Sequence, residues 1–151
     1  MIYILAILIG VAAGLRAMMP LAAIAWGAYL GWIDISAVPF LGYLSHLVAV
    51  ILISIIAIGE LITDQLPTTP SRKVPVQFGG RIFMGALTGA LLMVDSWIIG
   101  AILGIIGAVI GTYVGAWLRA RLAAAFGRDL PAALIEDVMA IVLAFLVVFL
   151  A

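Results

Sequence analysis

Apolar residues follow one another in long runs along this chain, and charged residues interrupt the runs at only a few places. Hydropathy divides the runs into five segments, at residues 2 to about 32, 41–62, 80–94, 97–118 and 131–150. A membrane-crossing helix needs about 20 apolar residues, and the runs lack the alternation expected of strands in a membrane barrel. The pattern therefore predicts an all-α membrane protein, a compact bundle of about five transmembrane helices that forms a single domain over residues 1–151.

The first segment is too long for one straight crossing. Its roughly 31 residues would reach about 45 Å as a helix, whereas the hydrocarbon core of a bilayer measures about 30 Å. It carries Gly14, Arg16 and Pro20 near its middle, and a proline removes a backbone donor and clashes with the preceding turn. The sequence therefore predicts a first helix that is kinked or broken between Gly14 and Pro20. As an alternative, residues 2–13 form a separate or re-entrant helix, which adds a crossing or a half-crossing.

Composition supports a membrane location and narrows the possible chemistry. Hydrophobic residues make up 68% of the chain and charged residues 9%, with a mean hydropathy of +1.41, far from the usage of soluble domains. The seven basic and seven acidic residues cancel, so no net field points to nucleic acid as a partner. Because the chain has no cysteine and a single histidine, His46, we expect no disulfide, no metal site and no cofactor.

The basic residues predict an orientation in the membrane. Arg72 and Lys73 lie between the second and third segments, while Arg119, Arg121 and Arg128 lie between the fourth and fifth. Five crossings bring both connections to one side, which the positive-inside rule makes cytoplasmic, so we expect the N-terminus inside and the C-terminus outside. The first four of these side chains are candidates to bind anionic lipid headgroups. The alternative is that they only determine topology.

Glycines recur at intervals of three and four residues in the fourth segment and therefore fall on one ridge of a helix. They are Gly100, Gly104, Gly107, Gly111 and Gly115. Such a ridge lets a second helix approach closely and gain van der Waals contact that lipid does not supply. The sequence predicts close helix packing at this ridge, either inside one chain or across a homo-oligomer.

Arg16 is the most informative charged residue. An arginine near the centre of a membrane segment costs at least ~2.5 kcal/mol, so it must face a carboxylate, a wet cavity or the bundle interior. Glu60 and Asp64, one helical turn apart on the second segment, are candidate partners. Glu136 and Asp137 at the start of the fifth segment are others, and Arg81 competes for the same carboxylates. We therefore expect one intramembrane cluster that consists of Arg16, Glu60, Asp64, Arg81 and Glu136.

Two interpretations of this cluster stay open. In the first, the charges form a buried ion-pair network that fixes helix register and moves nothing. In the second, Glu60 changes its protonation or binds a cation during transport, while Arg16 tunes Glu60 or binds an anionic substrate. Asp137 is interpreted only as a carboxylate that suits the start of a helix.

Several polar motifs occur in a fixed order: GLRAMMPLAAIAW, LGWIDIS, GELITDQLPTTPSR, RIFMGALTGA and ALIEDVMAI. With the glycine-rich fourth segment, they resemble the small bacterial membrane proteins catalogued as domain of unknown function 4126, over about residues 14–148. The resemblance implies a helical protein of the bacterial inner membrane. It implies these marked polar and turn residues: Gly14, Arg16, Glu60, Asp64, Pro67, Pro70, Ser71, Arg72, Arg81, Glu136 and Asp137. Gln65 departs from the pattern, since the family tends to carry lysine there.

The leading functional hypothesis is a small transporter or channel-like protein that moves a small ion or solute at the charge cluster beside a helix break. Membrane lipids and a second copy of the chain, with a dimer favoured, are the expected partners. The alternative is a structural or accessory membrane subunit that binds lipids or partner proteins, in which the cluster is purely structural. An enzyme is disfavoured, because the sequence shows no serine nucleophile motif, no metal motif and no phosphate-binding loop.

Overall fold

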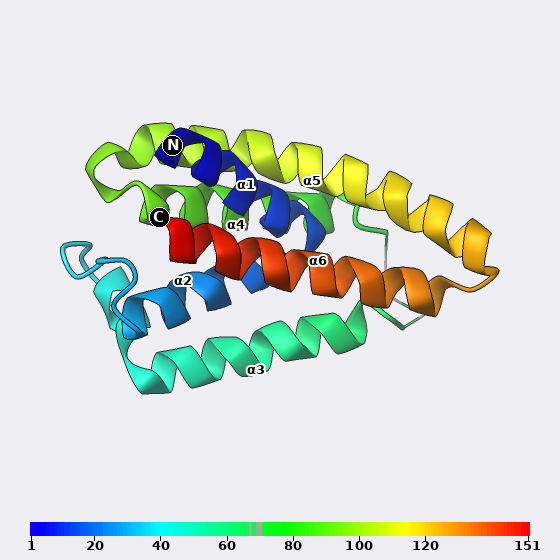
Figure 1. The fold of residues 1–151 in the computed structure, drawn as a ribbon, viewed down its shortest axis with the longest axis horizontal. Helices are drawn as coiled ribbons and strands as arrows, with labels where there is room; N and C mark the ends of the chain where they lie inside the picture. Colours follow the sequence, from blue (N-terminus) through cyan, green and yellow to red (C-terminus); the bar gives the residue numbers. More distant parts are fainter. Residues whose placement is uncertain (67, 69–70) are drawn as a thin grey trace.

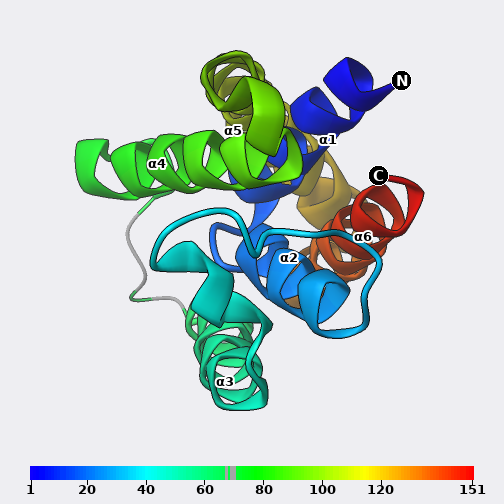
Figure 2. The same cartoon turned by 90° about the vertical axis from the view of Figure 1, so that its left-hand side faces the viewer.

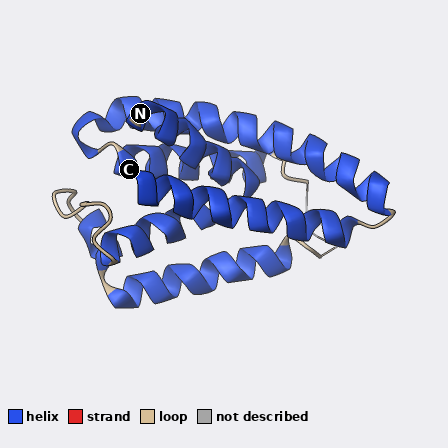
Figure 3. Ribbon diagram, in the orientation of Figure 1, coloured by secondary structure: helices blue, strands red, loops and turns tan. Residues whose placement is uncertain are grey.

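The computed structural model describes residues 1–66, 68 and 71–151. Its helices in chain order are α1 (Ile2–Leu15), α2 (Met19–Tyr29), the 3-10 helix η1 (Leu41–Ser45), α3 (Leu47–Thr63), α4 (Pro75–Leu92), the 3-10 helix η2 (Val94–Ser96), α5 (Trp97–Phe126) and α6 (Asp129–Leu150) (Figure 1). No strand occurs among the described residues (Figure 3), which confirms the all-α prediction for that part of the chain. Pro67 and Pro70, marked as turn residues by the family resemblance, lie outside the described residues.

Two stretches are long and apolar enough to cross a membrane, judged by length and composition within the described ranges. They are Val94–Phe126, which joins η2 to α5, and α6. The helices α1, α2 and α3 are also apolar but shorter. The prediction of a helical, apolar protein is therefore confirmed, whereas the number of five crossings stays a prediction.

The predicted break in the first apolar segment is confirmed between Gly14 and Pro20. Helix α1 ends at Leu15, and Arg16 follows with an extended backbone, at φ −143° and ψ 116°. Pro20 lies in the first turn of α2, where its missing N–H would have no partner within the helix. The chain does not merely kink there: α1 and α2 run in opposite directions (Figure 1). This arrangement matches the alternative of a separate first helix.

The reversal at Arg16 also changes where the chain ends lie. From α1 to α6, consecutive helices alternate in direction, and both termini lie at the same end of the molecule (Figures 1 and 2). The connections at residues 71–74 and 127–128 lie at the opposite end. Both chain ends lie at one end because α1 and α2 run in opposite directions, where one kinked helix was expected. The side of a membrane on which each terminus lies stays a prediction.

The glycines of α5 lie where this helix meets α1 and α4 most closely. A Cβ atom built on each glycine would meet the backbone or a side chain of a neighbouring element. Gly100 and Gly104 face Gly89 and Gly85 of α4; Gly107 and Gly111 face Ile7 and Val11 of α1; Gly115 faces Leu15, Arg72 and Glu136. Helix α1 is thereby held against α5, with α4 and α6 as further neighbours. This packing fixes the depth at which Arg16 enters the bundle.

Candidate functional site

The end of α1 leaves backbone carbonyls without helical partners, and Arg81 of α4 binds two of them. Its Nη1 atom donates to the carbonyl oxygens of Gly14 and Leu15, both at 2.7 Å. The side chain is 2% exposed. A helix leaves its last four carbonyls unpaired and carries partial negative charge at that end. A buried arginine therefore satisfies both the hydrogen bonds and the charge of the broken end.

The chain just before α2 presents free N–H groups, and these are bound by Glu60 of α3. The two carboxylate oxygens accept hydrogen bonds from the N–H groups of Ala17, at 2.7 Å, and Met18, at 2.8 Å. A carboxylate is the favourable group at a helix N-terminus. The sequence suggested Glu60 as a partner for Arg16, but the structure places it on the backbone of the break.

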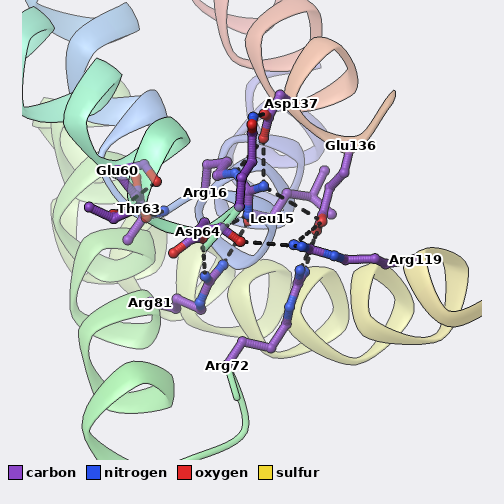
Figure 4. Close-up of polar contacts among 12 residues, drawn as sticks. Leu15, Arg16, Glu60, Thr63, Asp64, Arg72, Arg81, Arg119, Glu136 and Asp137 are labelled. Carbon is purple, nitrogen blue, oxygen red and sulfur yellow. Dashed lines mark hydrogen bonds and ion pairs between the residues drawn. The ribbon is translucent and has the colours of Figure 1, made fainter. Parts of the chain in front are cut away.

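Arg16 itself is fully buried and surrounded by carboxylates from two helices (Figure 4). Its Nε donates to Asp137 at 2.6 Å, and its Nη1 donates to Asp64 at 2.8 Å. Its Nη2 lies 2.5 Å from Asp137 and 3.8 Å from Glu136. Asp64 also lies 3.3 Å from Arg81. The structure thus brings Arg16, Asp64, Arg81 and Glu136 together, as the sequence suggested.

The sequence offers Asp137 as one candidate partner of Arg16, but the predicted cluster leaves it out, because its place near a helix start gave it a sufficient explanation. The signal that points to it is spacing: Ala133, Asp137, Ala140 and Ala144 lie on one buried stripe of α6. Gln65 donates to the second oxygen of Asp137 at 2.9 Å. A lysine at position 65, as the family pattern favours, would place a positive charge near the same carboxylate.

Two arginines expected at lipid headgroups lie against the charge cluster instead. Arg72 binds both oxygens of Glu136, one of them at 2.8 Å. Arg119 binds Asp129 with its Nε and Nη2, at 2.9 and 2.6 Å, and lies 3.5 Å from Glu136. The sequence could not show this, because both side chains are long enough to reach either the membrane surface or the interior.

Lys73 and Arg121 lie outside the cluster, and both side chains are exposed beside α5. The Lys73 ammonium lies 5.6 Å from the centre of the Tyr113 ring, and the Arg121 guanidinium lies 5.3 Å from the centre of the Trp117 ring. Cation–π pairs of this kind suit a membrane interface, where an aromatic ring and a cation share one depth. The binding of these two side chains to lipid headgroups stays a prediction.

A cavity of about 380 Å³ adjoins the cluster on the side of the basic connections. We call it the arginine cavity, since Arg72, Arg81 and Arg119 form part of its wall. Asp64, Asp129, Ser71 and Gln77 are its other polar lining residues. Among the residues that the structure describes, no three His, Asp or Glu side chains are grouped so as to hold a metal ion.

These features define a class: an all-helical, strongly apolar protein with a broken helix whose free backbone groups are held by buried charges. The family model described as "Domain of unknown function (DUF4126)" matches residues 3–151, so the chain belongs to this family. No curated protein and no solved structure matches the chain.

Proposed function

We propose that the protein spans the bacterial inner membrane as one helical bundle and moves a small polar solute or ion across it. The long apolar stretches of α5 and α6 support a membrane location. The basic connections at residues 71–74 and 127–128 would lie in the cytoplasm, by the positive-inside rule. Both chain ends would then face away from the cytoplasm, because they lie at the opposite end of the fold.

The helix break beside the arginine cavity is the observation that carries this proposal. Broken helices whose ends point into a polar site are a recurrent construction in membrane transporters, because the free N–H and carbonyl groups bind solutes and ions. Here Arg81 holds the carbonyl end and Glu60 holds the N–H end. The cavity is lined by Arg81, so a solute in it would meet one of the two side chains that hold the break.

Arg16 provides a means of changing state without creating an unpaired charge. Asp64, Asp137 and Glu136 all lie within 3.8 Å of its guanidinium. A shift of α1 and α2 that exchanges Asp64 for Glu136 would leave Asp64 with Arg81, which avoids the ~3–5 kcal/mol that a single buried charge typically costs. We propose that this exchange accompanies movement of the solute past the break.

A dimer and bound lipids complete the proposal. The outer face of α3 carries exposed isoleucines, among them Ile51, Ile55, Ile58 and Ile62. This face would contact lipid tails or a second copy of the chain. Lys73 and Arg121 would contact anionic headgroups at the cytoplasmic surface.

An accessory subunit is the second candidate, and the close pairing of four largely buried charges favours it. Arg16, Arg72, Asp64 and Glu136 each meet an opposite charge within 2.8 Å. Such a network stabilises one arrangement of helices and needs no solute. In that case the arginine cavity would have no role in movement across the membrane.

Flux into liposomes separates the two candidates. Purified protein would be reconstituted, and uptake of protons, sodium, potassium and phosphate would be compared with empty liposomes. We expect uptake of at least one species, with a loss in folded Glu60→Gln and Arg16→Ala variants. The matched control is Arg121→Gln, which removes an exposed charge from α5 outside the cluster. No uptake of any species by the wild type would instead support the accessory subunit.

A further inference from the structure

The arginine cavity offers hydrogen-bond donors that the protein does not fully use. Arg81 is almost completely buried, and its Nε has no hydrogen-bond partner among the described residues. This arginine lines the cavity together with Arg72 and Arg119. A buried donor without an acceptor is unfavourable, and the three guanidinium groups on the wall would attract acceptor oxygens that enter the cavity.

The two aspartates on the cavity wall are held very differently. Asp64 lies inside, 12% exposed, between Arg16 at 2.8 Å and Arg81 at 3.3 Å. Asp129 lies at the surface with its side chain 57% exposed, and its hydrogen bonds run to Arg119. Water therefore reaches Asp129 readily, and its carboxylate can leave Arg119 without becoming a buried charge. Asp129 is the exchangeable anion of the site.

Departure of Asp129 would leave the cavity cationic. Arg72 and Arg119 share the single carboxylate of Glu136, and Arg81 shares Asp64 with Arg16. The freed Arg119 fork presents two parallel donors, the geometry that matches a carboxylate or a phosphate. From this we infer that the arginine cavity binds the phosphate or carboxylate group of an anionic molecule, which replaces Asp129 on Arg119.

The size of the cavity indicates more than a bare ion. About 380 Å³ falls at the lower end of the roughly 300–1,000 Å³ typical of small-molecule sites. Ser71 and Gln77 supply uncharged hydrogen-bonding groups for the remainder of the molecule. The anionic group belongs either to a free solute or to a lipid headgroup. As a substrate assignment this inference rests on the proposed function, but binding can be tested without transport.

Binding of inorganic phosphate to the purified protein in uncharged detergent tests the inference. Calorimetric titration would give the dissociation constant, and a concentration-dependent rise in Tm would support it. We expect Arg119→Gln to weaken binding at least ~10-fold and Arg119→Lys to weaken it less, because lysine keeps the charge but loses the fork. Asp129→Asn should strengthen binding by about threefold or more, because it removes the competing anion. Arg121→Gln should leave binding unchanged.

A second arm identifies the source of the anionic group. The protein would be placed in phosphatidylcholine vesicles with and without phosphatidic acid, and lipid association would be measured for the Arg119 and Asp129 variants. If association with phosphatidic acid follows the same order of variants and free phosphate does not bind, the site is assigned to a lipid headgroup. If neither probe depends on Arg119, or if Asp129→Asn weakens binding, the inference is wrong.

The flux assay keeps this inference separate from the proposed function. Phosphate binding that depends on Arg119, without uptake of any solute by liposomes, would leave the anion site standing and remove transport. Uptake of a cation that depends on Glu60 and Arg16, without anion binding, would support transport and rule out the anion site.

Discussion

Helices α1 and α3 are both short and almost wholly apolar, yet they occupy opposite environments. Eight of the 14 residues of α1 are buried, whereas α3 buries three of its 17, Val50, Ile53 and Ala57. Figure 2 shows α3 at the edge of the bundle, beside α2, while α1 lies against α5. Hydrophobicity is therefore no guide to burial in this protein.

Small residues explain the difference between the two helices. Gly10 and Gly14 of α1 lie against the backbone of α5, at positions where a Cβ atom would collide with it. The only glycine of α3, Gly59, has open space around its Cβ position. In a bilayer, apolar helices gain little by leaving lipid, so close packing and polar contacts determine which of them associate. α1 has both, and α3 is joined to the break mainly through Glu60 and Asp64.

Removal of Arg16, at the end of the buried helix α1, should lower the free energy of unfolding most. Arg16→Ala leaves Asp137 and Asp64 without their closest cation, and an uncompensated buried charge costs about 3–5 kcal/mol. We expect a large fall in the free energy of unfolding, measured by thermal or denaturant unfolding in detergent. Arg121→Ala is the matched control, with an expected change within about 0.5 kcal/mol. Equal stability of the two variants would mean that Arg16 does not hold the break.

A single methyl group tests the close packing directly. Gly104→Ala drives a Cβ atom into the backbone of Gly85, and overpacking against a rigid backbone costs about 3 kcal/mol. Gly59→Ala in α3 makes the same chemical change in open space and should stabilise by up to about 1 kcal/mol, through helix propensity. Unfolding of both variants in one detergent gives the comparison. A similar result for the two would contradict the account of small-residue packing.

Glu60 links the loosely packed helix α3 to the break. Its removal should therefore lower the free energy of unfolding less than the Arg16 and Gly104 substitutions do. Glu60→Ala deletes both acceptors of the Ala17 and Met18 N–H groups, and loss of such a cap costs about 1–2 kcal/mol. Glu60→Gln keeps one acceptor oxygen and should lose less. Unfolding measurements rank the two variants. If glutamine proved as harmful as alanine, the negative charge would matter more than the hydrogen bonds.

The outer face of α3 should give the smallest effect. Ile55 is 60% exposed, so Ile55→Ala should change the free energy of unfolding by no more than about 0.5 kcal/mol. The measurement should be repeated over a range of protein concentrations. A loss above about 1 kcal/mol that depends on concentration would show that a second copy covers this face.

The sequence pattern predicts most of the helices, but it does not predict the direction that the chain takes after Arg16. Long apolar runs predict helices, and Arg16 with Pro20 predicts a break, because each has a local physical cause. The reversal of the chain at Arg16 has no local signature. A kink and a turn use the same residues, and packing of α1 on α5 decides between them.

The site shows the same division between local and tertiary causes. Arg16 had to meet carboxylates, so Asp64 and Glu136 were identifiable from the sequence. The bond from Glu60 to the break was not, because it joins a side chain to backbone groups about 40 residues earlier. Arg72 and Arg119 lie in basic connections, which the positive-inside rule explains fully. Nothing in the sequence therefore indicated that they also reach Glu136.

The turn of the chain at Arg16 is the central claim, and labelling from the two sides of a membrane tests it most directly. The chain has no cysteine, so single cysteines can be added before Met1, after Ala151 or at Ser71 and labelled with an impermeant maleimide in sealed, oriented vesicles. The account predicts that both chain ends react from one side and that Ser71→Cys reacts from the other. Chain ends that react from opposite sides would contradict it, because the first segment would then cross the membrane once.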